Sequence, residues 1–334
     1  MQDVLNALVL FANFVLVPGL VYGAQISLGA LGVTLIFGIL RFANFAYGEL
    51  MAFGAMITIL LTWWLQAANI TFGPLPTALL ALPFGILATI LVALICDRAV
   101  FRFYRRQRAA PIILVMASVG VMFILNAVVR LIIGTGDQNF ADGTRFLVTV
   151  RGFREQTGLA EGIVLRVPSV ITIVVAIAVL VALFLFLQRS RMGKAMRAYS
   201  DNEDLALLSG INPERIVMVT WGIAATLAAV AGVLYGLDKS FRPMTYFQLM
   251  LPIFAATIVG GIGQPAGAVA GGFIIAFTEV SLTYAYRRVF EYLGFEPQSL
   301  MQMVSIDYKY AISFVILVVV LLVRPTGIFK GRVL

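Results

Sequence analysis

The sequence predicts an all-α protein, a polytopic transmembrane helix bundle that contains a broken or re-entrant glycine-rich hairpin. Composition is the first observation behind this: 61% of the 334 residues are hydrophobic and 12% are charged, against roughly 45–50% and 25% in soluble globular chains. The second is a series of apolar stretches near membrane-crossing length, and the third is a glycine-rich break within one apolar region. Because water cannot solvate so apolar a chain, we expect lipid around it.

Composition also limits the organisation and the chemistry of the chain. No polar linker divides the apolar stretches, so we expect one transmembrane domain over residues 1–334. The single cysteine, Cys96, excludes an internal disulfide. The absence of histidine removes bis-histidine haem, most zinc sites and every Ser-His or Cys-His catalytic pair. The first residues lack the positive region of a signal peptide, so none is expected.

A transmembrane helix needs about 20 apolar residues, and the chain offers a succession of such stretches. The expected spans are 15–39, 45–65, 77–96, 111–133, 168–187, 214–237, 266–284 and 309–323. Residues 4–14 are apolar as well, but Pro18 and Gly19 interrupt the run. We therefore expect 4–14 to form a short helix against the bundle and not a span of its own.

Basic residues in the loops predict the orientation of the bundle. Loops 97–110 and 188–215 are rich in arginine, whereas loops 134–167 and 285–308 mix arginines with carboxylates. Three more basic residues lie in the carboxyl tail: Arg324, Lys330 and Arg332. The asymmetry places the two arginine-rich loops and the carboxyl terminus in the cytoplasm, and the amino terminus outside. It also accounts for the net charge of +8 without any nucleic-acid partner.

The glycine-rich region lies within 250–284, which must leave the outer face and return to it if this orientation holds. Its first arm, Leu251–Gly263, has about 13 residues and is too short to cross the bilayer. The residues expected to break the helix are Gly260, Gly261, Gly263 and Pro265. Irregular backbone at membrane depth survives only inside protein or beside a cavity, which favours a broken or re-entrant hairpin. No strand precedes the glycines, so a dinucleotide-binding loop is not expected.

Two carboxylates fall inside apolar segments, Glu49 and Glu279. Because a charge near the bilayer centre costs on the order of 3 kcal/mol, such a residue usually faces the bundle interior. Glu49 has two interpretations of equal weight: it caps local backbone or pairs with Arg41, or it belongs to a translocation path. For Glu279 a structural role is favoured.

The arginine-rich loop 188–215 is locally organised. Ser200 followed by Glu203 is typical of a capping box, which predicts the start of a short helix. Gly210 is placed to end that helix in a left-handed conformation, and Asn212 to cap the next span.

The predicted short helix has Leu205 and Leu208 on one face. A helix of two turns is marginal alone and needs packing to persist. It either lies on the bilayer surface or docks into a partner protein.

Several segments resemble one family, the LivH-type permeases of branched-chain amino-acid ABC transporters. Asn44-Phe45-Ala46-Tyr47-Gly48-Glu49 is similar to an Asn-Phe-Ala-His-Gly-Glu segment of that family. The loop within 190–213 resembles its cytoplasmic coupling loop, 228–234 is similar to the segment that follows, and 260–272 resembles its glycine hairpin. The resemblance covers most of the chain in order. Two departures stand out: Tyr47 replaces the usual histidine, and loops 66–76 and 285–308 are long.

The resemblance implies a single permease domain that forms half of an importer's path for branched-chain amino acids or a related amide, urea or aromatic acid. It implies a bacterial inner-membrane location, a second, LivM-like permease, two LivG/LivF-like cytoplasmic ATPase subunits and a periplasmic substrate-binding protein. ATP and magnesium would bind to the ATPase subunits, because this chain has no phosphate-binding loop motif and is not expected to be an enzyme. The implied substrate-path residues are Asn44, Tyr47 and Glu49. The implied coupling residues are Arg197, Glu203, Asp204, Leu205, Leu208 and Gly210.

A different class of function stays open at this stage. A secondary transporter or channel that works without ATP would also explain the intramembrane carboxylates and the broken hairpin. It would not explain an organised helix in the arginine-rich loop.

Overall fold

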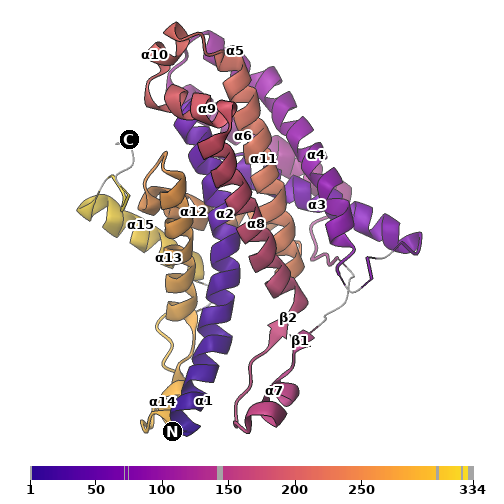
Figure 1. The fold of residues 1–334 in the computed structure, drawn as a ribbon, viewed down its shortest axis with the longest axis vertical. Coiled ribbons are helices and arrows are strands. Elements are labelled where there is room, and N and C mark those ends of the chain that lie inside the picture. The colour runs from indigo at the N-terminus through magenta and orange to yellow at the C-terminus, as the bar shows by residue number, and fades with distance from the viewer. Residues whose placement is uncertain are drawn as a thin grey trace.

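The computed structural model of the protein describes residues 2–70, 72–73, 75–140, 146–305, 308–324 and 326–329. Within this part of the chain it is a helix bundle, as predicted, with one small pair of strands (Figure 1). The first half contains α1 (Gln2–Phe11), η1 (Ala12–Leu16), α2 (Val17–Leu40), α3 (Tyr47–Ala67), α4 (Ala78–Cys96), η2 (Asp97–Phe101), α5 (Arg102–Arg106), α6 (Pro111–Ile133), β1 (Phe146–Val148), α7 (Val150–Thr157) and β2 (Leu165–Arg166). The second half contains α8 (Val167–Arg189), α9 (Arg191–Asp201), α10 (Glu203–Leu208), α11 (Pro213–Asp238), α12 (Pro243–Gly260), α13 (Pro265–Thr283), α14 (Arg287–Tyr292) and α15 (Lys309–Val323).

Eight helices of the described part are long and apolar enough to cross a membrane. The predicted set of eight differs from them at one place. The 18 residues of α12 qualify, whereas α15 has the predicted bounds but only 15 residues and falls short of the required length.

The first helix corrects the expectation for residues 4–14. They do not form a separate helix, because α1, η1 and α2 run on as one 39-residue helix from Gln2 to Leu40. Pro18 lies in the first turn of α2, directly after the π-helical turn Ala12–Leu16. A wider turn at this point relieves the clash between a proline ring and the carbonyl one turn before it. At 1.5 Å per residue the helix is roughly 58 Å long, so it extends well beyond a membrane core of about 30 Å.

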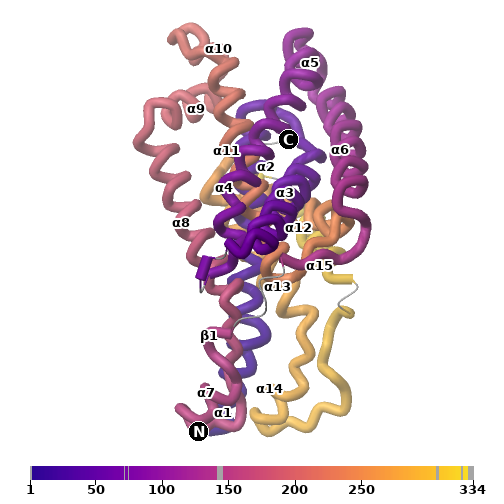
Figure 2. The backbone as a smooth tube through the Cα atoms, turned by 90° about the vertical axis from the view of Figure 1, so that its right-hand side faces the viewer, coloured from indigo at the N-terminus to yellow at the C-terminus, as the bar shows by residue number. Residues whose placement is uncertain are grey.

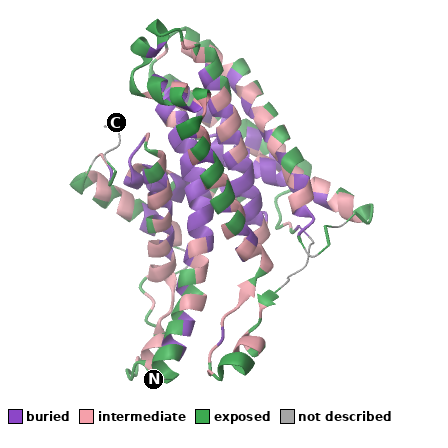
Figure 3. Cartoon of the chain, in the orientation of Figure 1, coloured by how far each residue is buried: buried purple, intermediate pink, exposed green. Residues whose placement is uncertain are grey.

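The centre of the bundle is built from α2, α3 and α11, which Figure 3 shows as the most buried ribbons. Small residues let these helices approach closely, as is common in membrane bundles. Gly232 of α11 lies against the backbone of Met51 in α3, where a Cβ would overlap the main chain. On the same side, Gly54 of α3 lies against Ala229 of α11. Packing of this kind fixes α3, which carries the predicted path residues Tyr47 and Glu49.

The two kinds of loop lie at opposite ends of the bundle. Figures 1 and 2 place α5, α9 and α10 at one end, and α1, α7 and α14 with the amino terminus at the other. At the amino-terminal end, Tyr292 donates a hydrogen bond to Glu161 at 3.2 Å, and Arg288 forms an ion pair with Glu161 at 3.7 Å. The antiparallel pair β1–β2, which pairs Phe146 with Arg166, lies in this lobe and was not predicted. The charge asymmetry therefore sorted the loops correctly. Asp142, Arg145, Lys330 and Arg332 lie outside the described residues.

The first arm of the glycine-rich hairpin is longer than predicted. It has 18 residues and not 13, because α12 begins at Pro243. The sequence prediction missed the first turns because polar residues, Thr245 and Gln248 among them, interrupt the apolar run before Leu251. At about 27 Å the arm approaches the thickness of a membrane core. A re-entrant course therefore stays a prediction.

Candidate functional site

Asn44 lies in the short connection between α2 and α3, and only 1% of its surface is exposed. Its Oδ1 accepts a hydrogen bond from the Ala46 backbone N–H at 3.0 Å, which shapes the turn into α3. Its Nδ2 has no hydrogen-bond partner in the described part of the chain. Buried donors are rarely left unpaired, so this amide group is one candidate contact for a polar solute.

Glu49 lies in the first turn of α3, where the helix dipole favours a negative charge. Only 1% of its surface is exposed. Its Oε1 accepts a hydrogen bond from Asn126 Nδ2 of α6 at 2.8 Å, and its Oε2 has no partner among the described residues. The ion pair with Arg41, the local alternative, is not formed. Arg41 instead donates to the backbone carbonyl of Ser200 at 3.0 Å. Glu49 thus joins two helices and keeps one free oxygen.

Tyr47 is fully buried between two other helices. Its hydroxyl donates to the Ala224 carbonyl of α11 at 3.3 Å, and its ring fills the space that the missing side chain of Gly32 leaves on α2. Residues two apart on a helix are about 200° apart around its axis, so Tyr47 and Glu49 point to different sides of α3. The three predicted path residues are all interior, but Tyr47 and Glu49 do not share a side of α3.

Glu279 connects α13 to α15. It is 2% exposed, and its Oε1 accepts a hydrogen bond from the hydroxyl of Ser313. A carboxylate that holds two helices together agrees with the structural role favoured for this residue. Asn126 and Ser313, the two partners of the buried carboxylates, were missed by the sequence reasoning. Their only signal is a polar residue within an apolar stretch.

The loop 190–213 forms two helices, of which only the second was predicted. In α9 the N-cap Ser190 accepts a hydrogen bond from the Gly193 N–H at 2.8 Å. Gly193 also lies against the backbone of α8 near Leu187, where a Cβ would overlap the main chain. The pattern Ser190-x-x-Gly193 was the available signal for α9.

The predicted capping box of α10 is not formed. Ser200 belongs to α9 and donates to the Gly38 carbonyl at 3.1 Å. The N-cap is Asn202, whose Oδ1 accepts from the Leu205 N–H at 3.1 Å. The helix begins at Glu203, so only the residue directly before it has the extended backbone that a cap requires. The Glu203 carboxylate accepts from the Tyr199 hydroxyl instead, at 2.7 Å.

The leucines of α10 are exposed, as the predicted coupling role requires. The exposed fraction is 61% for Leu205 and 85% for Leu208, while Ala206 between them is buried. Arg197 and Asp204 are exposed too. The helix ends at Leu208, and Gly210, two residues later, has the predicted left-handed conformation, with φ of +79°.

Asn212 caps α11 as predicted, because its Oδ1 accepts from the Glu214 and Arg215 N–H groups. The helix α10 is thus flanked by capped turns at both ends, and its leucines are exposed within the described chain.

The glycine break joins α12 to α13 through residues 261–264. Gly261 and Gly263 have φ of +107° and +83°, which explains why glycine is needed there. Gly260 touches the backbone of Gly267 closely, and Pro265 begins α13. The last carbonyls of α12 accept hydrogen bonds from the backbone N–H groups of residues 328–329, so the end of the helix is satisfied inside the protein.

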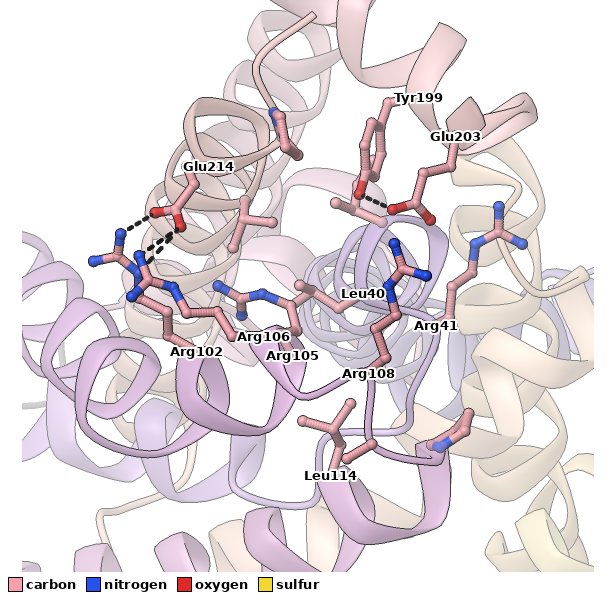
Figure 4. A pocket seen from close by; sticks show the side chains of 15 residues that line it. Leu40, Arg41, Arg102, Arg105, Arg106, Arg108, Leu114, Tyr199, Glu203 and Glu214 are labelled. Atoms are coloured by element: carbon pink, nitrogen blue, oxygen red, sulfur yellow. Dashed lines mark hydrogen bonds and ion pairs between the residues drawn. The ribbon is translucent and has the colours of Figure 1, made fainter. Parts of the chain in front are cut away.

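A pocket of about 330 Å³ lies at the arginine-rich end, between the end of α2, α5, α9–α10 and the start of α11 (Figure 4). Glu214 forms ion pairs there with Arg102 at 2.6 Å and with Arg106 at 3.5 Å. Burial, together with the neighbouring Glu203, raises the pKa of the Tyr199 hydroxyl, so it stays a hydrogen-bond donor at neutral pH.

The sequence is similar to those of known transport permeases. The family described as "Branched-chain amino acid transport system / permease component" matches residues 15–321. The high-affinity branched-chain amino acid transport system permease protein LivH of Salmonella typhimurium is 31% identical over 94% of each chain, and the corresponding BraD of Pseudomonas aeruginosa 30% identical over 95% of each. A xylose transport system permease protein, XylH of Haemophilus influenzae, is 33% identical over 31% of this chain and 30% of its own. No solved structure matches. The chain belongs to the family of branched-chain amino acid transport permeases and is a multi-pass membrane protein.

Proposed function

We propose that this permease forms half of the translocation path of an ABC importer in a bacterial inner membrane. A second, similar permease completes the path, two cytoplasmic ATPase subunits supply the energy, and a periplasmic binding protein delivers the solute. The observation that carries the proposal is α10, a six-residue helix that exposes Leu205 and Leu208. Such a helix gains little from its own hydrogen bonds, whereas burying one leucine contributes about 1.5–3 kcal/mol.

The ATPase subunits must be separate chains, because the sequence has no Gly-x-x-x-x-Gly-Lys-[Ser/Thr] motif to hold phosphates. The short connections of α10 to its neighbours support its use as a coupling element. Asn202 caps the start of α10 and Gly210 sets the direction of the chain after it, so a displacement of α10 by a bound ATPase would move α9 and α11 as well.

The solute is a branched-chain amino acid or a related small polar molecule, such as an amide, urea or an aromatic acid. The names of the LivH and BraD relatives support the first of these, and their similarity covers nearly the whole chain. Asn44 and Glu49 offer a free buried amide and a free carboxylate oxygen to the solute or to water. Tyr47 contributes indirectly, because it packs the start of α3 against α2 and α11.

The coupling proposal is tested by co-purification of the ATPase subunits from cells that express the whole neighbouring gene cluster. Leu208→Asp would bury a charge in the contact, and Gly210→Val would disfavour the left-handed exit by roughly 1–2 kcal/mol. Both variants are expected to lose most of the retained ATPase, or to hydrolyse ATP without uptake, while membrane insertion is unchanged.

Leu293→Asp is the matched control, because Leu293 is an exposed leucine at the opposite end of the bundle. It should retain the ATPase like the wild type. Recovery of no ATPase with the wild-type chain would contradict the importer proposal and favour a transporter or channel that works without ATP.

A further inference from the structure

The pocket at the arginine-rich end is unusual in its charge. It is lined by five arginines, Arg41, Arg102, Arg105, Arg106 and Arg108. Two carboxylates, Glu203 and Glu214, line it as well. Figure 4 shows the arginines reaching into one space from α2, α5 and the turn after α5. At about 330 Å³ it is at the lower end of the range of roughly 300–1,000 Å³ for small-molecule sites.

Three of these arginines form ion pairs inside the protein. Glu214 accepts from Arg102 and Arg106, as described above. Arg105 makes a two-pronged contact with Asp97, at 2.5 Å and 3.2 Å. Asp97 is held in turn by the indole N–H of Trp221 at 2.8 Å. The guanidinium groups in this part of the pocket are therefore already bound by carboxylates.

Arg41 and Arg108 have no carboxylate partner among the described residues, although Arg41 donates a hydrogen bond to the backbone carbonyl of Ser200 at 3.0 Å. Neither forms an ion pair within the part of the chain that the structure describes. The five guanidinium groups and the three nearby carboxylates, Glu203, Glu214 and Asp97, have a net charge of +2. Glu203 lies nearby, but it is engaged by the Tyr199 hydroxyl. The pocket thus keeps two cationic groups that no carboxylate of the described chain pairs with.

The backbone at these two arginines is also unusual. Arg41 and Arg108 have φ of +59° and +52°, a left-handed conformation that favours glycine over any residue with a Cβ. Both conformations are closed by backbone hydrogen bonds, from Arg41 to Phe37 and from Arg108 to Arg105, each at 3.0 Å. Backbone strain of this kind concentrates at functional sites. Both arginines line the same pocket, as Figure 4 shows.

The pocket lies where the apolar surface of the bundle ends. Directly after the turn that carries Arg108, α6 exposes Ile112 and Met116, with exposed fractions of 59% and 68%. On the other side, Phe103 of α5 is 57% exposed. Exposed apolar side chains on a membrane helix face acyl chains, so the arginines next to them lie at the depth of the lipid headgroups.

From this geometry we propose that the pocket binds a phosphate group through Arg41 and Arg108, and that the phosphate belongs to the headgroup of an anionic phospholipid. Guanidinium groups match phosphate oxygens with paired hydrogen bonds. A lipid there would fill the space between α5, α10 and the start of α11. It would also lie beside the base of the exposed helix α10, because Tyr199, in the last turn of α9, lines the same pocket.

The test measures lipid binding to the purified full-length chain by native mass spectrometry. Phosphatidylglycerol is titrated against phosphatidylcholine, whose headgroup carries a compensating ammonium. Wild type is expected to retain phosphatidylglycerol in preference. Arg108→Gln and Arg41→Gln should each weaken that binding about tenfold, the loss of one charge-assisted hydrogen bond. Arg98→Gln is the matched control, because Arg98 lies in the same basic segment, is exposed and does not line the pocket.

A second arm adds inorganic phosphate to the chain in a phosphatidylcholine background. Phosphate binding that Arg108→Gln abolishes, without any preference for phosphatidylglycerol, would retain the phosphate site and assign it to a soluble ligand. Equal losses in Arg98→Gln and Arg108→Gln, or no binding of either probe, would overturn the proposal. The measurement needs no ATPase partner, so its failure is distinct from failure of the importer proposal.

Discussion

At the scale of single residues, the sequence identified the buried carboxylates but not what they contact. Glu49 and Glu279 stand out because a charge in an apolar run is costly. Their partners, Asn126 and Ser313, lie 77 and 34 residues away along the chain, and a small polar residue in a helix carries no sign of its neighbour. The same limit explains the misplaced cap of α10. Ser200 fits a capping pattern as well as Asn202 does, and only the break between α9 and α10 decides between them.

The first residue-scale prediction concerns Glu49. Glu49→Gln keeps the shape and can still accept from Asn126, but it removes the charge and the free carboxylate oxygen. We expect solute uptake to fall several-fold while the permease still assembles. Glu49→Ala should in addition lower the free energy of unfolding by about 1–3 kcal/mol, because Asn126 then loses its buried partner. Uptake and thermal unfolding are measured on the same preparations. Unchanged uptake in both variants would remove Glu49 from the path.

At the scale of elements, amino-acid patterns located the helices well and their ends poorly. Most predicted spans coincide with observed helices to within a few residues, since long apolar runs define them. The failures occur at the ends of helices. Pro18 was expected to separate residues 4–14 from the span that follows, yet it lies within one continuous helix. A π-helical turn next to Pro18 provides the compensation, and it is not visible in a local pattern. The first turns of α12 were missed because polar residues interrupt the apolar run there.

The glycine break gives the prediction at this scale. An added Cβ at Gly260 would overlap the backbone of Gly267, which would push α12 away from α13. Gly260→Ala should therefore lower the free energy of unfolding by roughly 1–3 kcal/mol. Gly222→Ala on α11 is the control, because no atom lies within 4 Å of its added Cβ. There, the higher helix propensity of alanine should stabilise by up to about 1 kcal/mol. Thermal unfolding in detergent that ranks the two variants the other way would contradict the close contact.

At the scale of the whole molecule, the distribution of charge predicted which loops share an end of the bundle. Arg102 of one arginine-rich loop pairs with Glu214 at the end of the other, and Glu161 of one mixed loop contacts Arg288 of the other. These pairings place the loops but not the membrane sides. The expected side comes from the positive-inside rule, because basic residues orient each loop during membrane insertion, before the loops fold together.

The last prediction assigns those sides. In a Cys96→Ala background, a cysteine replacing Lys194 on α9 is expected to react with a thiol reagent only from the cytoplasm. A cysteine replacing Gln156 on α7 should react only from outside. Both positions are exposed, so a lack of reaction cannot come from burial, and each serves as the control for the other. Position 143, another site in the outer loop, lies outside the described residues. If position 156 reacted only from the cytoplasm, the bundle would have the opposite orientation to the one predicted. The helix α10 would then lie outside, where no cytoplasmic ATPase could reach it.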